Sequence, residues 1–273
     1  MELRDLTSLD DFRQVVELEK EIWGVDYSDV VCAPILAVSV KRGGVLIGAF
    51  EGPRMVGFVY SLPGIKDGKP IQWSHMLGVV DEYRNAGLGR TLKLEQRLRS
   101  IAIGCDLVEW TYDPMQALNA HLNFVKLGVV VEEYGVDMYG ESASHLHRGT
   151  PTDRFIAQWW IREPHVVRRI ESRSLAVVRA PEAADAPVVN RIGPAASWPA
   201  CADYDLDRSD RRLWVEIPTG FTEMQIQAPD VALGWRMATR AIFTTYFGRG
   251  YRAVDFVLDR PAGRGRYLLA QKT

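Results

Sequence analysis

The chain has 273 residues and a formal net charge of −2, with 47% hydrophobic and 25% charged residues. This composition is typical of a globular protein of one large or two small domains, and it argues against a basic nucleic-acid binder. No apolar run approaches the roughly 20 residues of a membrane span. The acidic start lacks the apolar segment of a secretory signal, so we expect a cytoplasmic protein.

The cysteines and histidines do not form a metal-binding pattern. Cys32, Cys105 and Cys201 are far apart and odd in number, so we expect reduced, structural thiols. His145 and His147 alternate in a polar segment without neighbouring carboxylates or cysteines, which favours a surface loop over metal ligation. The sequence therefore predicts no metal site.

The N-terminal region predicts two helices. Ser8 with Asp11 has the form of a capping box, and the helix that it begins carries a mostly apolar stripe up to Gly24. A second helical segment is expected from residue 28 to the glycines at 43–44, interrupted by Pro34.

Strand and helix patterns then alternate. Strand-like apolar runs are separated by Gly, Pro and Asp turn signals. Helices are expected at residues 87–103 and 113–127, each followed by a glycine. The predicted strands of this half are residues 2–6, 45–52, 54–64, 71–80, 107–112, 129–140 and 153–161.

A glycine-rich turn connects the strand at 71–80 to the helix at 87–103. Glycines let the backbone bend sharply and come close to a ligand. The start of the following helix adds unpaired N–H groups and partial positive charge, and Arg84 and Arg90 add full charges. Such a hollow suits a pyrophosphate. The spacing fits neither a nucleotide-hydrolase phosphate loop nor a dinucleotide-binding fingerprint, whereas a tight turn without a ligand remains an alternative.

The segment Arg84-Asn85-Ala86-Gly87-Leu88-Gly89 resembles the Arg/Gln-x-x-Gly-x-Gly/Ala turn of the GNAT superfamily of N-acyltransferases. The element order up to about residue 163 is also similar to that family. The resemblance implies an α/β (α+β) fold, with a mixed, mostly antiparallel central sheet flanked by helices. It also implies acetyl-CoA or another acyl-CoA as co-substrate, and no metal.

The resemblance further implies how the cofactor is held. Backbone amides of the turn would bind the pyrophosphate, and the preceding strand would pair with the pantetheine arm where the fourth and fifth strands part. The thioester would then end near residues 75–79. The implied cofactor-binding residues are Leu77, Val79, Arg84, Asn85, Ala86, Gly87, Leu88, Gly89 and Arg90.

The strand before the turn carries a candidate general base. An alkyl ammonium, with a pKa near ~10.4, must lose its proton before it attacks a thioester, so a base is useful. Strand alternation predicts that Trp73, His75, Leu77 and Val79 share one face. Some GNAT enzymes have a histidine at the matching position, which implies His75 as the base. A buried histidine with a packing role is the alternative.

The group that would protonate the leaving thiolate is less clear from the sequence. Many family members use a tyrosine four residues before the glycine that ends the helix after the fifth strand; here that glycine is Gly128, and the matching residue is Phe124. Asn119 or Asn123 could bind the pantetheine or support the thiolate, or simply be exposed on the helix. Glu109 is an alternative base or a group that binds the ammonium. Proximity and orientation could supply most of the rate.

The C-terminal part is predicted to form a second domain. We divide the chain into an acyl-CoA-binding catalytic domain, residues 1–168, and a partial, degenerate GNAT-like domain, residues 169–273. The second contains predicted strands at 211–218, 252–259 and 266–271 and a helix from residue 229. An unrelated α+β extension is the alternative.

Three side chains of this second domain are candidates for a role in the reaction. Tyr246, four residues before Gly250, fits the family's helix-end pattern and is either a packed relic or an acid. Arg236 and Arg240, one turn apart, are candidates to bind an acceptor carboxylate.

The sequence therefore favours an acyl-CoA-dependent N-acyltransferase. It would transfer an acetyl or succinyl group to the amine of a small molecule or amino acid. A non-catalytic acyl-CoA-binding or regulatory module and a protein N-acetyltransferase are the alternatives, because fold alone does not choose among them. The expected partners are a CoA thioester and an amine acceptor, with neither nucleic acid nor membrane; a homodimer is left open.

Overall fold

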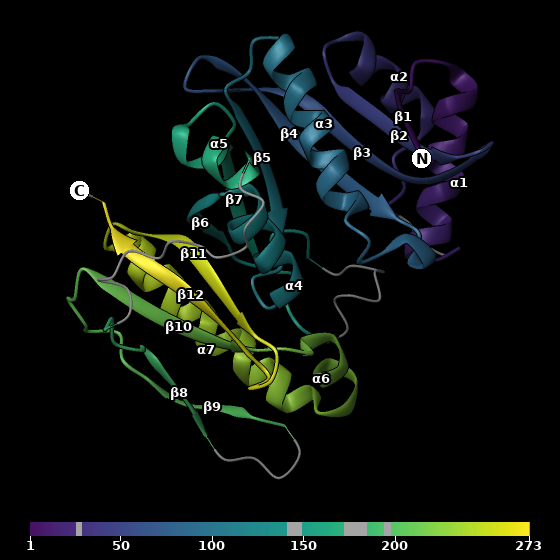
Figure 1. Ribbon diagram of the computed structural model, residues 1–273. Helices are drawn as coiled ribbons and strands as arrows, with labels where there is room; N and C mark the ends of the chain where they lie inside the picture. The colour runs from purple at the N-terminus through teal and green to yellow at the C-terminus, as the bar shows by residue number, and fades with distance from the viewer. Residues whose placement is uncertain (26–28, 141–148, 172–184, 194–197, 273) are drawn as a thin grey trace. The chain divides into compact units, whose positions relative to one another are not determined.

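The computed structural model describes residues 1–25, 29–140, 149–171, 185–193 and 198–272 (Figure 1). Two compact units are present: unit 1 comprises Met1–Trp110 and Trp160–Glu163, and unit 2 comprises the rest of the described chain. The chain is of mixed α/β class with a mostly antiparallel sheet flanked by helices, which confirms the predicted fold class. His145 and His147 lie outside the described residues.

Unit 1 contains the predicted N-terminal strands and helices. Its strands follow the order β1-β2-β3-β4-β5, and all neighbours are antiparallel except β4 and β5, which are parallel. The elements are β1 (Glu2–Asp5), α1 (Leu9–Trp23), α2 (Ala33–Lys41), β2 (Val45–Glu51), β3 (Arg54–Lys66), β4 (Lys69–Val79), the 3-10 turn η1 (Asp81–Tyr83), α3 (Leu88–Ala102) and β5 (Leu107–Tyr112), whose last two residues belong to unit 2.

The first two helices begin for different local reasons. The capping box is confirmed: the Asp11 backbone N–H donates to Ser8 Oγ at 3.1 Å, and the Ser8 N–H donates to Asp11 Oδ2 at 3.0 Å. The prediction that Pro34 interrupts the second helix is wrong. Pro34 lies in the first turn of α2, where its missing N–H would have had no helical partner and its fixed φ suits the helix.

Helices cover both faces of the unit 1 sheet. Two glycines on adjacent strands mark the close approaches: a Cβ on Gly57 would lie 3.4 Å from Leu88 of α3, and one on Gly78 would lie 2.8 Å from Ile22 of α1. Gly57 pairs with Val79 and is therefore on the face opposite Gly78. The sheet is thus buried between α1 on one face and α3 on the other, with a continuous apolar core from β1 to α3.

A β-bulge interrupts β4 at the position of the predicted base. The β3–β4 register shifts between Tyr60, which pairs with Met76, and Ser61, which pairs with Ser74. His75 is therefore the extra residue of the bulge, and side chains before and after it exchange faces. The prediction that Trp73 and Leu77 share one face is wrong for this reason.

In unit 2 the strands follow the order β7-β6-β11-β12-β10, antiparallel throughout, and β8 and β9 form a separate ribbon. Its elements are α4 (Ala117–Ala120), the π-helical η2 (His121–Leu127), β6 (Val130–Gly135), β7 (Arg154–Trp160), α5 (Pro164–Glu171), β8 (Asn190–Gly193), β9 (Ala200–Tyr204), β10 (Arg212–Pro218), α6 (Phe221–Gln227), α7 (Pro229–Gly248), β11 (Tyr251–Asp259) and β12 (Arg264–Gln271).

The sheet of unit 2 is symmetric about the β6–β11 pair. On one side η2 precedes the β6–β7 hairpin, and on the other α7 precedes the β11–β12 hairpin. The two halves share an aromatic core in which Phe155 of β7 meets Phe243 of α7, with ring centroids 4.6 Å apart. This symmetry agrees with an internal repeat, but a degenerate GNAT-like domain at 169–273 stays a prediction.

Candidate active site

The turn between β4 and α3 has the local geometry of an anion-binding loop. Asn85 and Gly87 adopt left-handed backbone conformations, with φ of 62° and 90°. Among the described residues, no hydrogen bond uses the backbone N–H groups of residues 85–89, whereas the Thr91 N–H already donates to Gly87 O. These free donors lie at the N-terminus of a 15-residue helix, so the turn can bind an anion such as a pyrophosphate.

The two arginines of the turn are not equivalent. Arg84 pairs with Asp81 at 2.6 Å, and its Nε donates to Val79 O at 3.0 Å. It therefore joins the end of β4 to η1 and stiffens the entrance to the turn, while its charge stays at the exposed surface. Arg90 lies half-buried in the first turn of α3.

The β4 backbone is open along the edge that leads to this turn. In the part of the chain that the structure describes, β4 and β5 pair only at Gln72 with Val108 and at Trp73 with Glu109. From Ser74 to Val79, β4 pairs with β3 alone. The parting of strands that the resemblance implies is present, and its edge can accept an extended ligand as a further strand.

His75 projects from the bulge at the start of this open edge. Its ring meets that of Tyr60 edge to face, with centroids 6.1 Å apart. The His75 side chain is exposed, and desolvation by neighbouring groups lowers its pKa below the usual value of 6.5. The direction of this shift favours the neutral form, which can accept a proton.

Three buried side chains, Glu19, Ser39 and Tyr60, each carry an oxygen without a well-formed hydrogen bond among the described residues. Glu19 of α1 is fully buried, and its Oε2 accepts the Val31 N–H at 2.9 Å, whereas its Oε1 has no such partner. The hydroxyls of Ser39 and Tyr60 also lack a well-formed hydrogen bond, although the two side chains interact with each other. Burial raises the pKa of Glu19 to about 7 and raises that of Tyr60. The sequence pattern contained the signal, because Glu19 falls within the apolar stripe of its helix.

Glu109 does not lie free for catalysis. It is buried on β5 and forms an ion pair with Lys66 at the end of β3. A carboxylate that already neutralises a lysine is a weak candidate for a base or for an ammonium ligand. This pair instead joins the end of β3 to β5.

Asn119, Asn123 and Phe124 belong to unit 2. Asn119 is exposed on α4, whereas Asn123 is buried in the π-helical turn. Phe124 is fully buried against Tyr267, with ring centroids 5.7 Å apart. Phe124 is thus a core residue of unit 2.

A buried lysine that the sequence analysis did not single out lies on α3. Lys93 Nζ donates to Ser74 Oγ at 2.8 Å and to Gln96 Oε1 at 3.2 Å, and it lies 3.7 Å from the ring centroid of Trp110. Lys93 is 2% exposed, and burial lowers its pKa well below the usual lysine value.

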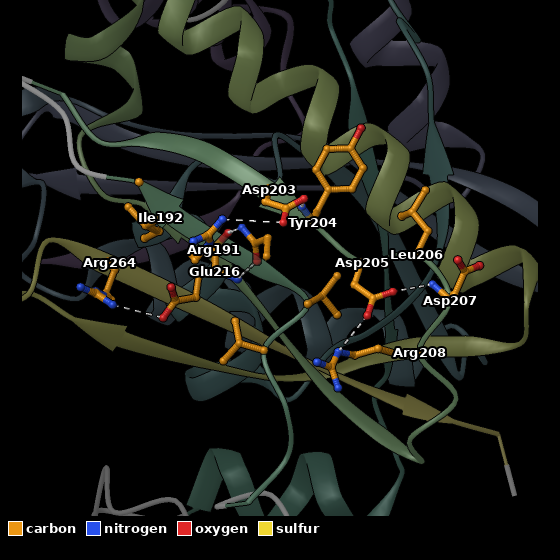
Figure 2. A pocket seen from close by; sticks show the side chains of 14 residues that line it. Arg191, Ile192, Asp203, Tyr204, Asp205, Leu206, Asp207, Arg208, Glu216 and Arg264 are labelled. Carbon is orange, nitrogen blue, oxygen red and sulfur yellow. Dashed lines mark hydrogen bonds and ion pairs between the residues drawn. The ribbon is translucent and has the colours of Figure 1, made fainter.

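Unit 2 contains a polar cavity of about 1100 Å³ between β8, β9 and the segment that follows β9 (Figure 2). Its arginines pair with carboxylates of the same cavity, Arg264 with Glu216 at 3.4 Å and Arg208 with Asp205 at 3.5 Å. The glycine turn and His75 are in unit 1, so this cavity is not the predicted acyl-CoA site.

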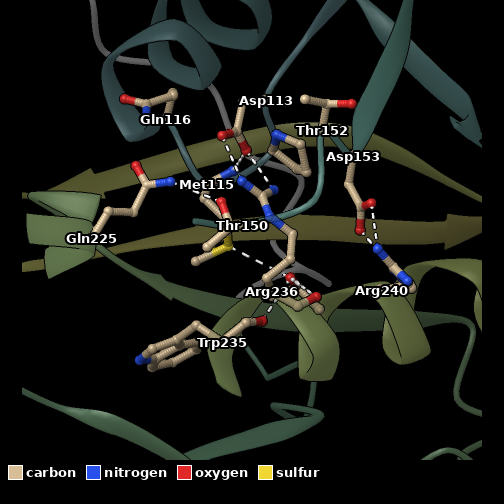
Figure 3. Close-up of polar contacts among 12 residues, drawn as sticks. Asp113, Met115, Gln116, Thr150, Thr152, Asp153, Gln225, Trp235, Arg236 and Arg240 are labelled. Atoms are coloured by element: carbon tan, nitrogen blue, oxygen red, sulfur yellow. Dashed lines mark hydrogen bonds and ion pairs between the residues drawn. The ribbon is translucent and has the colours of Figure 1, made fainter. Parts of the chain in front are cut away.

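Arg236 and Arg240 are held by carboxylates within unit 2 (Figure 3). Arg236 makes two hydrogen bonds of 2.6 Å to Asp113, and both side chains are buried. Arg240 binds Asp153 through bonds of 2.8 and 2.7 Å. These carboxylates make both arginines weak candidates to bind an acceptor carboxylate, although Arg236 Nε has no hydrogen bond among the described residues, and that role stays a prediction.

Tyr246 also has a structural role. It is fully buried, and its hydroxyl donates to Asp205 O at 2.8 Å. Among the described residues, no group of His, Cys, Asp and Glu side chains is arranged to hold a metal ion, and no helix is long and apolar enough to cross a membrane.

Several solved structures are similar to about three fifths of the chain. The protein smu.2055 of Streptococcus mutans UA159 is 19% identical with a TM-score of 0.48, covering 59% of this chain and 99% of that one. The ribosomal-protein-S18-alanine N-acetyltransferase of Escherichia coli is 14% identical with a TM-score of 0.47, covering 59% and 93%. The PaiA N-acetyltransferase of Thermoplasma acidophilum, in complex with coenzyme A, is 18% identical with a TM-score of 0.41, covering 57% and 96%.

No protein-family model and no curated protein sequence matches the chain. Two helices follow β1, an antiparallel meander leads through the glycine turn into α3, and β5, a helix and a hairpin follow. This is the element order that the sequence analysis predicts for residues 1–163.

Proposed function

We propose that the protein is an acyl-CoA-dependent N-acyltransferase that acts on the amine of a small molecule or amino acid. The observation that supports this most is the continuity of two features within unit 1. An unpaired strand edge, Ser74–Val79, runs directly into a turn with free backbone donors, residues 85–89. A CoA thioester has one extended, amide-containing arm and one pyrophosphate, and it needs these two features in this order.

His75 would act as the general base. It stands at the bulge where the open edge begins, and desolvation by neighbouring groups lowers its pKa, which favours the neutral form. It would take the proton of the attacking amine, while the thioester carbonyl carbon forms the new amide bond and the thiolate leaves. Acetyl is the expected acyl group, with succinyl as the alternative.

Binding is tested with Gly89→Glu. Gly89 lies in the first turn of α3 with an ordinary φ, and a Cβ there would meet only Leu77 at 3.7 Å. A glutamate near a helix N-terminus stabilises the helix by roughly 0.3–1 kcal/mol, so the variant should fold. Its charge would repel the pyrophosphate, and we expect calorimetric affinity for CoA to fall at least about tenfold, equivalent to 1.4 kcal/mol.

A matched control is available in unit 2. Gly234→Glu adds the same charge to an exposed helical position where a Cβ would meet nothing within 4 Å, and it should leave the CoA affinity unchanged. Equal affinities of Gly89→Glu and the wild type would refute the site.

Catalysis is tested by following thiol release from acetyl-CoA and succinyl-CoA with a panel of amines, amino acids and N-terminal peptides. Release that depends on a small amine supports the proposal, whereas release with peptides alone indicates a protein N-acetyltransferase. CoA binding with no transfer to any amine would indicate a non-catalytic acyl-CoA-binding module.

A further inference from the structure

The interior of unit 1 holds a lysine without a carboxylate partner. Lys93 is 2% exposed, and among the described residues no acidic side chain lies within ion-pair distance of its Nζ. Its contacts are two neutral oxygens and an aromatic face, from Ser74, Gln96 and Trp110. A buried, uncompensated amine is costly, so this arrangement calls for a reason beyond packing.

The hydrogen bonds among Ser74, Lys93 and Gln96 depend on whether Lys93 is protonated. Ser74 Oγ accepts from Lys93 Nζ at 2.8 Å and from Gln96 Nε2 at 3.0 Å, which occupies both of its lone pairs. With Lys93 as an ammonium, the Ser74 O–H has no acceptor among the described residues and is available to a ligand. With Lys93 neutral, the Ser74 O–H can donate to Nζ, and the three side chains form a closed ring of hydrogen bonds.

Ser74 stands where the two parallel strands separate. The last β4–β5 pair is Trp73 with Glu109, so Ser74 is the first residue of the open edge. The register places Ser74 on the same face as Leu77 and Val79, toward α3. The neighbouring residue His75 projects from the bulge. The proposed base His75 and Ser74, the cluster residue on β4, are therefore neighbours in the chain.

We infer that Lys93, acting through the hydroxyl of Ser74, donates the proton that the leaving CoA thiolate takes up. The inference rests on the proposed function and assigns the role left vacant by Phe124, which is buried in the core of unit 2. In the step, the C–S bond breaks, Ser74 gives its proton to sulfur, and Lys93 gives a proton to Ser74. The amine attacks in its neutral form, and the one proton that its nitrogen loses on becoming an amide passes to His75. Solvent later reprotonates Lys93 and deprotonates His75, so protons balance over a turnover.

The chemistry suits this donor. A thiol has a pKa of about 8.5, whereas an ordinary lysine at about 10.4 is a weak acid toward it. Burial lowers the pKa of Lys93 and brings the two groups closer together. On the elements around it, the charged or titratable groups nearest to it along the chain or in strand register are His75 of β4, Glu109 of β5 with its partner Lys66 of β3, and Arg90 and Arg97, three residues before it and four after it on α3.

The test separates proton donation from charge and from packing. Lys93→Met preserves length and apolar contacts, and Lys93→Arg preserves the positive charge but cannot release a proton. Both should lower kcat about a hundredfold, at the lower end for general acid catalysis, and leave KM for acetyl-CoA nearly unchanged. Ser74→Ala should have the same effect, and Ser74→Ala/Lys93→Met should lose no more than either single variant, because the two groups act in series.

Two further measurements complete the experiment. The wild-type rate should fall at high pH as Lys93 loses its proton, and this alkaline limb should be absent in Lys93→Met. In the free protein, NMR titration of labelled lysine should show one Nζ, missing in Lys93→Arg, that titrates well below the others. Ser100→Ala makes the same serine substitution elsewhere on α3, where Ser100 Oγ donates only to Gln96 O, and should keep wild-type kinetics.

Each remaining outcome overturns the inference. Wild-type kcat in Lys93→Arg would show that only charge matters, and an unchanged alkaline limb in Lys93→Met would remove Lys93 from the reaction; the proposed function would survive both results. If the wild-type protein binds CoA but transfers to no amine, the proposed function fails and the inference fails with it.

Discussion

Glu19 provides a test of the structure that needs no substrate. It is fully buried on α1, one carboxylate oxygen lacks a partner, and burial raises its pKa from 4.5 to about 7. Below pH 4.5 the group is protonated in the folded and unfolded states alike, and its contribution to stability is fully present. Between about pH 4.5 and 7 only the unfolded state loses the proton, so stability falls as the pH rises.

The size of the effect follows from the two pKa values. At about 1.4 kcal/mol per pH unit, a rise from 4.5 to about 7 corresponds to about 3 kcal/mol lost by pH 8. In Glu19→Gln, a neutral amide replaces the carboxyl and can still accept the Val31 N–H. We therefore expect the variant to be more stable than the wild type at pH 8, by up to about 3 kcal/mol, and nearly equal to it at pH 4.5.

The measurement is native-state hydrogen exchange of the β3 amides at pH 4.5 and 8, which reports the opening of unit 1 separately from that of unit 2. Comparing variant and wild type at the same pH cancels the intrinsic pH dependence of exchange. Glu17→Gln, on the exposed side of the same helix, is the control and should change stability by less than about 0.5 kcal/mol at either pH. A difference between Glu19→Gln and wild type that does not vary with pH would refute the reasoning.

Two further predictions concern backbone and charge. Arg236→Met leaves Asp113 buried without its two hydrogen bonds, and it should destabilise unit 2 by about 3–5 kcal/mol in thermal unfolding; Asp113→Asn in the same chain should recover much of that loss, and an unaffected single variant would contradict the pairing. Gly87→Ala, at a φ of 90°, should cost about 1 kcal/mol or more, whereas Gly89→Ala, at an ordinary helical φ, should be neutral or stabilising. Equal urea midpoints for these two alanine variants would contradict the left-handed assignment at Gly87.

Local signals in the sequence were sufficient for much of unit 1. The capping box of Ser8 and Asp11 and the glycine turn at 84–89 depend on residues a few positions apart, and both are found where predicted. The bulge at His75 could not be predicted in this way. A single extra residue leaves the alternation of apolar side chains almost intact, and only the pairing with β3 reveals it.

Long-range pairing limited the interpretation of unit 2. Arg236 and Asp113 are 123 positions apart. The sequence alone therefore did not show that the two arginines on this helix face have carboxylate partners, and both were predicted to bind a ligand. The helices α5 and α6 and the β8–β9 ribbon were not predicted, because these elements are short and intrinsic propensity decides little over so few residues.

The treatment of buried charge differs between the two sites. In unit 2, Arg236 and Arg240 each bind a carboxylate through two hydrogen bonds. Each arginine charge is thus neutralised by its partner, and the pairs connect α7 to other segments of unit 2. In unit 1, among the described residues, Lys93 lacks an acidic partner and Glu19 Oε1 lacks any partner. Groups of this kind lower stability and are enriched at functional sites. The two lie on opposite faces of the unit 1 sheet, because Glu19 belongs to α1 and Lys93 to α3. Only Lys93 contacts Ser74, the residue next to His75, so Lys93 is the one of the two that the proposed reaction can use.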